Sequence, residues 1–242
     1  MKTRLLPGLL LAAMLVSCGP APALPHVSPE EAGLTWRECP AGAMSRKVEE
    51  ACLGEFPSRP GAGERGGGLR MGVRTEGGLR LTIGADTYRT LHLRLDAIPA
   101  WPWDPYVLFQ NHWPVAILWG QFQAYDPEIS LHSVAGKAAG EVADPRQATI
   151  IYDGQDLRRV YGLDAAYRPH ELAGQLVFVG RKGGEYFLVY DGQRVGPAFD
   201  EISIAYCCEA VLYAPRGGYE AYRFWGRRDG QSYVVAVAAE AG

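Results

Sequence analysis

The chain has 242 residues, of which 48% are hydrophobic and 21% are charged, and this composition excludes an intrinsically disordered protein. Its formal net charge of −3 disfavours a protein that binds nucleic acid through a basic surface. The 30 glycines and 17 prolines predict many turns, which disfavours a helical bundle or a coiled coil.

The first residues have the pattern of a secretory signal. Lys2 and Arg4 are followed by an apolar run at residues 5–16, which is too short to span a membrane as a mature helix. The run ends in Leu-Val-Ser-Cys at residues 15–18, which resembles the lipobox of bacterial lipoproteins. The alternative is an ordinary signal peptide that happens to contain a cysteine.

The resemblance to bacterial lipoproteins implies cleavage after a signal peptide of residues 1–17 and attachment of acyl chains to Cys18. The mature chain is then extracytoplasmic and is held on a membrane by those acyl chains. Gly19 follows the cysteine, which in a bacterium with two membranes resembles sorting to the outer membrane. Residues 18–28 are rich in Pro and Ala, so we expect a tether there.

Residues 29–56 contain the helical pattern of the chain, clearest at Ser45–Cys52, and we expect a small helical segment there. Cys39 and Cys52 are thirteen residues apart and are disulfide candidates in an oxidising compartment. The alternative is a pair of buried free thiols. Residues 57–68 have the composition of a Gly/Pro linker.

Cys207 and Cys208 are adjacent, and this spacing disfavours a disulfide between them. Neighbouring Cα atoms lie about 3.8 Å apart, below the usual range of about 4.4–6.8 Å for a bridged pair. We therefore expect two packed thiols.

Residues 69–242 show short strand patterns bounded by Gly, Pro or Asp, and they predict a mainly β domain of antiparallel hairpins. The predicted strands are 69–75, 79–84, 88–95, 106–110, 115–119, 149–152, 176–179, 186–190, 202–206, 210–213, 220–225 and 233–238. With the N-terminal part, the fold class is mainly β with a small helical N-terminal segment.

An internal repeat is visible in the C-terminal part of this domain. Phe178–Val189 and Phe224–Val235 are identical at five of twelve positions at an offset of 46 residues. The tetrapeptide Tyr-Asp-Gly-Gln occurs at residues 152–155 and again at 190–193. Repeats of 40 to 50 residues built from hairpins are typical of propeller blades. The alternative is a chance recurrence of ordinary hairpin composition.

The segment at residues 182–202 resembles blades of TolB-like periplasmic β-propellers, and the resemblance extends over roughly residues 149–242. It implies propeller-like sheets that serve as a binding scaffold, and no catalytic residue carries over. Only about two repeats are visible, whereas a closed ring needs at least four blades.

Motifs of catalysis and of cofactor binding are missing from the sequence. It contains no nucleophile elbow, zinc-protease motif, Walker A loop or EF-hand loop. The Gly-x-Gly-x-x-Gly at residues 61–66 lacks a predicted strand before it and a helix after it, so we expect no cofactor. Asp126, Glu128 and His132 are close in sequence, but Pro127 leaves their geometry undefined and we expect no metal site.

An aromatic stretch near the middle of the chain is the candidate binding surface. Aromatic faces beside polar groups can stack on sugar rings or anchor a protein partner. The alternative is that these side chains fix a loop onto the core. The candidate residues are Trp101, Trp103, Tyr106, His112 and Trp113.

A run of carboxylates provides the alternative of an enzyme. Asp153, Asp156, Asp164 and Glu171 lie in one stretch, and two such groups could act as acid and base on a glycoside. They could equally cap turns and form surface ion pairs. The sequence therefore favours a non-enzymatic binding module of the cell envelope. We expect its partner to be an envelope protein or a carbohydrate, and we expect no binding of nucleic acid. The alternative is an envelope hydrolase that uses residues 153–171.

Overall fold

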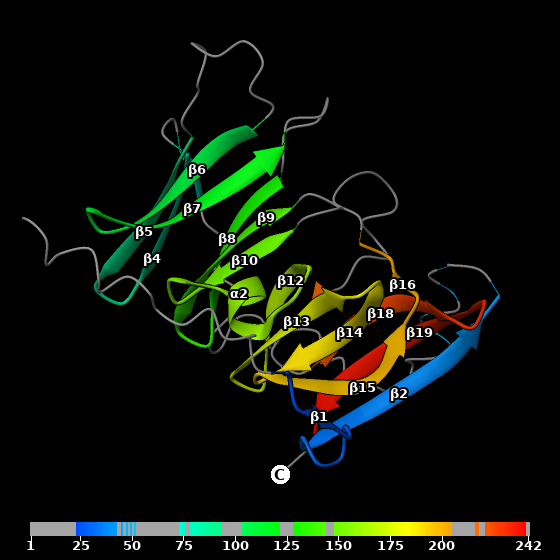
Figure 1. The fold of residues 1–242 in the computed structure, drawn as a ribbon. Coiled ribbons are helices and arrows are strands. Elements are labelled where there is room, and N and C mark those ends of the chain that lie inside the picture. The colour runs from blue at the N-terminus through cyan, green and yellow to red at the C-terminus, as the bar shows by residue number, and fades with distance from the viewer. Residues whose placement is uncertain are drawn as a thin grey trace, which may run out of the picture.

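The described part of the chain forms four sheets, which follow one another in sequence and lie in a row (Figure 1). A computed structural model describes residues 23–42, 45, 47, 49, 51, 73–75, 78–92, 103–121, 128–143, 148–204, 216–217 and 221–240. Apart from one short parallel pair, the strands are antiparallel. The prediction of a mainly β fold built from antiparallel hairpins is confirmed.

The first two sheets are simple meanders. The first sheet has the order β3-β4-β5-β6-β7 and the second the order β11-β10-β9-β8. The first comprises β3 (Val73–Thr75), β4 (Gly78–Ile83), β5 (Asp86–His92), β6 (Trp103–Gln110) and β7 (Trp113–Gln121). The second comprises β8 (Glu128–Val134), β9 (Lys137–Ala143), β10 (Thr149–Tyr152) and β11 (Gln155–Asp156), and the helix α2 (Leu157–Tyr161) follows it.

The third and fourth sheets each add a strand from the N-terminal part of the chain. The third has the order β1-β15-β14-β13-β12, and the fourth has the order β16-β18-β19-β2 with β17 paired to β18. The third comprises β1 (His26–Val27), β12 (Ala165–Leu172), β13 (Gln175–Lys182), β14 (Glu185–Tyr190) and β15 (Gln193–Phe199). The fourth comprises β2 (Leu34–Ala41), β16 (Glu201–Ile202), β17 (Arg216–Gly217), β18 (Ala221–Arg228) and β19 (Gln231–Ala239).

The prediction of a helical segment over residues 29–56 is wrong for residues 34–41. These residues form β2, which pairs with β19 along its whole length, from Leu34 opposite Ala239 to Ala41 opposite Ser232. The partner strand lies about 200 residues away in sequence, so the pairing leaves no local signal. The N-terminal strand β1 likewise lies within the predicted tether of residues 18–28.

Only part of the predicted helix Ser45–Cys52 is described. The Glu49 N–H donates to the Ser45 carbonyl oxygen at 3.1 Å, which is the spacing of an α-helical bond. The predicted signal peptide at residues 1–17 and the predicted linker at residues 57–68 lie outside the described residues.

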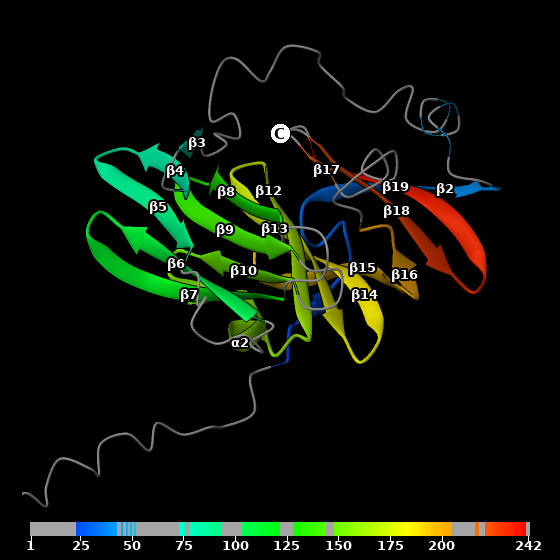
Figure 2. The same cartoon turned by 90° about the horizontal axis from the view of Figure 1, so that it is seen from above.

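Each sheet packs its apolar face on the next sheet. Leu81 and Leu108 of the first sheet meet Leu131 and Ile151 of the second. A larger core joins the second sheet to the third, and the largest joins the third to the fourth. Figures 1 and 2 place the first and fourth sheets at opposite ends of this row. In the described part of the chain no strand pairing joins those two sheets.

The two sequence repeats occupy equivalent places in successive sheets. Phe178–Val189 lies in the β13–β14 hairpin of the third sheet, and Phe224–Val235 lies in the β18–β19 hairpin of the fourth. The registers match, because each phenylalanine pairs with the final valine of its repeat. Phe178 packs into the core with the second sheet and Phe224 into the core with the third, so both face the preceding sheet.

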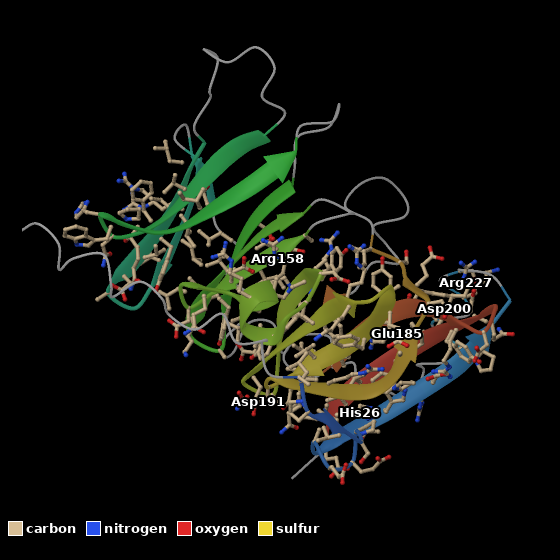
Figure 3. All side chains as sticks on the ribbon, in the orientation of Figure 1. His26, Arg158, Glu185, Asp191, Asp200 and Arg227 are labelled. Atoms are coloured by element: carbon tan, nitrogen blue, oxygen red, sulfur yellow. The ribbon has the colours of Figure 1, made fainter. Side chains whose placement is uncertain are left out.

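The segment before each sheet holds its long hairpin in the same way. Asp164 donates its N–H to the Arg181 carbonyl at 2.8 Å and accepts from the Gly183 N–H through Oδ2 at 2.7 Å. Asp200 donates its N–H to the Arg227 carbonyl at 2.8 Å and accepts from the N–H of the turn residue Asp229 at 2.9 Å (Figure 3). We call Asp164 and Asp200 the clamp aspartates.

The residue before each clamp aspartate packs against a glycine of the same hairpin. A Cβ atom on Gly180 would lie 3.4 Å from Leu163, and a Cβ atom on Gly226 would lie 2.5 Å from Phe199. The structural repeat is therefore longer than the sequence repeat. It was not visible in the sequence because Asp164 and Asp200 are 36 residues apart, whereas the hairpins are 46 residues apart.

Candidate functional site

Large exposed apolar side chains gather on the first sheet. In the described part of the chain these are Leu91 on β5, with 41% of its surface exposed, and Trp113 and Ile117 on β7, with 77% and 55% exposed. Apolar side chains of this size are usually buried, so their exposure on one terminal sheet marks that sheet as a candidate for interaction. Leu91 and Ile117 lie on one face, whereas Trp113 lies opposite Gln110 on the other.

Two of these side chains belong to one cross-strand row. Leu91 lies opposite Val107, and Val107 lies opposite Ile117. Directly opposed residues share a face of an antiparallel sheet, so the row crosses β5, β6 and β7 on the face turned away from the second sheet. On the same face the Arg89 guanidinium lies 4.9 Å from the centre of the Phe109 ring. The face is therefore apolar with a cationic neighbour.

Trp113 and His112 follow a tightly held turn. Asn111 adopts a left-handed conformation with φ of 55°, which asparagine tolerates better than most residues. Its side-chain oxygen accepts from the Thr87 N–H at 2.9 Å, and its amide donates to Asp86 at 2.8 Å. These bonds fix the β6–β7 turn on the β4–β5 hairpin, and both His112 and Trp113 are exposed beside it.

The other predicted binding residues are only partly placed by the structure. Trp103 and Tyr106 lie in β6, whereas Trp101 lies outside the described residues. Pro105 lies in β6 and is opposite Trp119 of β7, and among the described residues the pairing of β5 with β6 ends at Tyr106.

The four carboxylates at residues 153–171 are each engaged in a different local structure. Asp153 forms a 2.7 Å ion pair with Lys137, and Asp156 caps the N-terminus of α2 by accepting from the Arg158 N–H. Asp164 is the first clamp aspartate. Glu171 accepts from the Ala135 N–H in the β8–β9 turn at 2.7 Å. These are the contacts of turn-capping and ion-pairing residues.

A buried polar cluster connects the second and third sheets, and its residues are not among the candidates predicted from the sequence. Glu141 on β9 is only 2% exposed and accepts from the Ser130 hydroxyl at 3.3 Å. It also accepts from the backbone N–H of Arg168 at 2.7 Å. Arg168 has φ of 53° and lies where the register of β12 shifts. An Arg-Pro pair inside a strand is the sequence signal that could have indicated this bulge.

His132 and Tyr222 also belong to this cluster, and both interact with Arg168. His132 is 8% exposed, and burial together with the charge of Arg168 lowers the pKa of its imidazole to about 4. The Tyr222 hydroxyl donates to the Arg168 carbonyl at 3.1 Å, and burial raises the pKa of this phenol well above its ordinary value. The cluster thus places a neutral imidazole, a phenol and a carboxylate in the interior, where they join β8, β9, β12 and β18.

The predicted cysteine chemistry falls largely outside the described residues. Cys39 lies in β2 and takes part in a disulfide bond, so it is not a free thiol. Its partner is not among the described residues, and its pairing with Cys52 stays a prediction. The lipid-attachment candidate Cys18 also lies outside the described residues, as do Cys207 and Cys208.

Two further searches cover only the part of the chain that the structure describes. Within it, no group of three or more His, Cys, Asp or Glu side chains is arranged to hold a metal ion. Nor is any helix there long and apolar enough to cross a membrane. Comparison with protein-family models, with curated proteins and with solved structures finds no match to the chain.

Proposed function

We propose that this chain is an extracytoplasmic lipoprotein, anchored through acyl chains on Cys18, whose β domain is a non-enzymatic binding module of the cell envelope. In this proposal the four sheets are blades of an open, propeller-like scaffold of the kind that TolB-like proteins use for binding. The observation that carries the binding role is the exposure of Trp113, at 77%, beside a turn that three bonds of Asn111 hold in place.

A fixed, exposed tryptophan is suited to recognition. Its ring supplies a large contact area and loses little conformational entropy on binding because the turn beside it is already ordered. The neighbouring His112 is exposed and provides a hydrogen-bonding group next to the ring. An envelope protein or a carbohydrate offers the apolar and hydroxyl surfaces that such a pair contacts.

The binding role is tested with the intact lipoprotein on native membranes. Chemical crosslinking followed by affinity purification of the wild-type protein should recover one specific partner, and Trp113→Ala should reduce its yield at least about tenfold, as expected for an aromatic anchor. Arg159→Ala is the matched control, because the Arg159 side chain is 90% exposed on α2, whose Leu157 packs into the core between the second and third sheets. Equal recovery by the wild type and Trp113→Ala would refute the role of Trp113.

Soluble peptidoglycan fragments and envelope polysaccharide provide the second arm of this test. Binding of a carbohydrate should quench tryptophan fluorescence in the wild type, and the quenching should decrease in Trp113→Ala. A crosslinked protein partner without such quenching would identify a protein ligand.

The anchor is tested separately by metabolic labelling with a fatty acid. The wild-type chain should take up label, whereas Cys18→Ser should not, because this thiol is the acceptor in the lipobox-like sequence. Cys52→Ser is a matched control that removes a different cysteine. Label of equal strength in Cys18→Ser would contradict the lipoprotein proposal.

A further inference from the structure

The strand β7 is an outer strand of the first sheet. Its only strand neighbour in the described part of the chain is β6, at the end of the order β3-β4-β5-β6-β7. An outer strand presents a row of unpaired N–H and C=O groups, and proteins normally protect such rows with charged side chains, bulges or a cover.

This outer strand lacks the charged residues that the other long outer strands have, and only Pro114 and the register shift beside it interrupt its start. Four outer strands of the described sheets have seven residues or more, namely β2, β7, β8 and β12. Charged residues are present in β2 (Arg37, Glu38), β8 (Glu128) and β12 (Arg168). In contrast, Trp113–Gln121 contains no Asp, Glu, Lys or Arg. With Ile117 and Trp113 exposed, β7 has the properties of a strand that pairs with another chain.

The sequence of β7 is suited to pairing with itself. Ile117 is the central residue of this nine-residue strand. A two-fold axis through the sheet at this point places Ile117 opposite Ile117 of a second copy, and Val115 opposite Trp119. No charge meets a like charge in this pairing, because the strand has none. A two-fold interface needs such self-complementarity.

The pairing also accounts for the apolar row on this face, in which Leu91 and Ile117 are exposed and Val107 is buried. Opposed residues share a face, so Ile117 of each copy would continue the row of Leu91, Val107 and Ile117 across the axis. The row would then run through both sheets without a break, and the 55% exposure of Ile117 would fall.

Charge favours this edge-to-edge contact over the stacking of two faces. Arg80 and Arg89 are exposed and lie opposite each other on the outer face of the first sheet. Face-to-face stacking would bring the arginines of both copies together. In the edge-to-edge arrangement the two β5 strands are five strand spacings apart, about 24 Å, which is beyond the Debye length of about 8 Å.

We propose that β7 is a dimerisation strand, which pairs antiparallel with β7 of a second copy about a two-fold axis at Ile117. The result is one continuous ten-stranded sheet that joins the two chains. This register places Trp113 opposite Gln121 at each end of the shared strand pair and leaves His112 in the β6–β7 turn outside it. The dimer is tested at Ile117 and Leu91, so its failure is distinguishable from a failure of the binding role of Trp113.

The test measures the mass of the full-length protein in detergent by sedimentation and light scattering. The wild type should form dimers in a concentration-dependent way. Ile117→Lys places two charges opposite each other at the axis and should raise the dissociation constant at least about tenfold. Leu91→Lys is the matched control, because Leu91 lies on the same face but two strands from the interface, and it should leave the dimer intact.

A crosslink tests the register. Ile117→Cys should give a disulfide-linked dimer on mild oxidation, because directly opposed residues lie about 4.5–5.5 Å apart, within the Cα range of a disulfide. Leu91→Cys should not. Circular dichroism and thermal melting check that each variant is folded. A monomeric wild type, a dimer that survives Ile117→Lys, or a dimer disrupted by Leu91→Lys instead would each overturn the proposal.

Discussion

The first and fourth sheets differ in how their two faces are buried. In the fourth sheet Phe224 and Val235 pack toward the third sheet, while Trp225 and Val234 are buried on the opposite face. In the first sheet one face packs on the second sheet, and the other exposes apolar residues such as Ile117. Sheets buried on both faces hold the fold together, whereas a sheet buried on one face has a surface left over for recognition.

The electrostatic details of the two ends differ as well. In the fourth sheet Arg228 on β18 forms an ion pair with Glu38 on β2, so charge joins strands from the two ends of the chain. In the first sheet Arg89 contacts the Phe109 ring and remains exposed. The Arg228–Glu38 ion pair of the fourth sheet therefore links the N-terminal and C-terminal parts of the chain, whereas Arg89 of the first sheet faces outward.

The largest expected effect is a loss of stability, and it distinguishes the buried phenylalanines of the repeat, Phe178 and Phe224, from the exposed Ile117 of the first sheet. Phe178→Ala and Phe224→Ala should each lower the free energy of unfolding by about 3–5 kcal/mol, because both rings are fully buried. Ile117→Ala should lower it by less than about 1 kcal/mol, since Ile117 is exposed. Urea unfolding of the three variants measures all three values.

Similar losses for the two phenylalanines would support the equivalence of the two hairpins. A loss for Ile117→Ala as large as theirs would contradict the comparison. It would mean that the outer face of the first sheet contributes to folding as much as the cores between sheets do.

The second expected effect is a pH dependence of the free energy of unfolding, which comes from the buried side chain of His132. The folded-state pKa of His132 is about 4, below its ordinary value of 6.5. The unfolded chain therefore takes up this proton first as the pH falls, so the contribution is complete above about pH 6.5 and is lost progressively down to about pH 4. The loss is on the order of 3 kcal/mol.

His132→Gln isolates this contribution, because it removes the titrating ring and leaves the carboxylates that titrate in the same range. Urea unfolding at pH 7 and pH 4.5 should show a smaller drop in stability for the variant than for the wild type. Equal drops would show that another group dominates the acid sensitivity.

The sequence predicted strands best where turn residues and β-branched or aromatic residues agreed. The hairpin of β13 and β14 and that of β18 and β19 were found close to their actual bounds. The Tyr-Asp-Gly-Gln tetrapeptide at residues 190–193 contains the turn between β14 and β15, and both Asp191 and Gly192 have positive φ there. A type I′ turn needs this conformation at both central positions, which Asp-Gly and Asn-Gly pairs adopt readily.

The strands that were missed lack such local signals. The sequence of β9 is Lys-Ala-Ala-Gly-Glu-Val-Ala, which has little strand preference, yet Ala138 and Ala139 are buried. Both β12 and β15 contain a proline next to a register shift. Tertiary packing and bulges place these segments in sheets, and a single sequence does not show those contacts.

The candidate site was predictable only in part for the same reason. His112 and Trp113 were singled out because aromatic faces beside polar groups can stack on sugar rings or anchor a protein partner. Ile117 and Leu91 were not, since their exposure depends on the first sheet being last in the row. Glu141 and Arg168 are 27 residues apart, and only the packing of the second and third sheets brings them together.

A third prediction concerns the glycine beneath Phe199. A Cβ atom on Gly226 would lie 2.5 Å from Phe199 Cδ1, and Phe199 is itself buried. Gly226→Ala should therefore cost about 1–3 kcal/mol by overpacking the fourth sheet. Gly42→Ala is the matched control, because nothing lies within 4 Å of the added carbon. Equal stability of the two variants in thermal melts would contradict this packing.

The smallest expected effect concerns the side-chain hydrogen bonds that hold turns in the first sheet and in the third and fourth sheets. Asp164→Ala and Asp200→Ala each remove one side-chain acceptor from a turn N–H, and each should cost about 1 kcal/mol. Asn111→Ala in the first sheet removes two side-chain bonds and leaves a positive φ on alanine, so its cost should be somewhat larger, about 2 kcal/mol.

Hydrogen exchange of the turn amides separates local from global effects. In Asp164→Ala the Gly183 amide should exchange faster, and in Asp200→Ala the Asp229 amide should. Core amides of the same sheet should exchange faster only by the amount that the loss of global stability accounts for. Matching local effects at these two positions would extend the repeat beyond the residues that match in sequence. Faster exchange in only one of them would mean that the two clamp aspartates are not equivalent, even though the hairpins they contact have the same register.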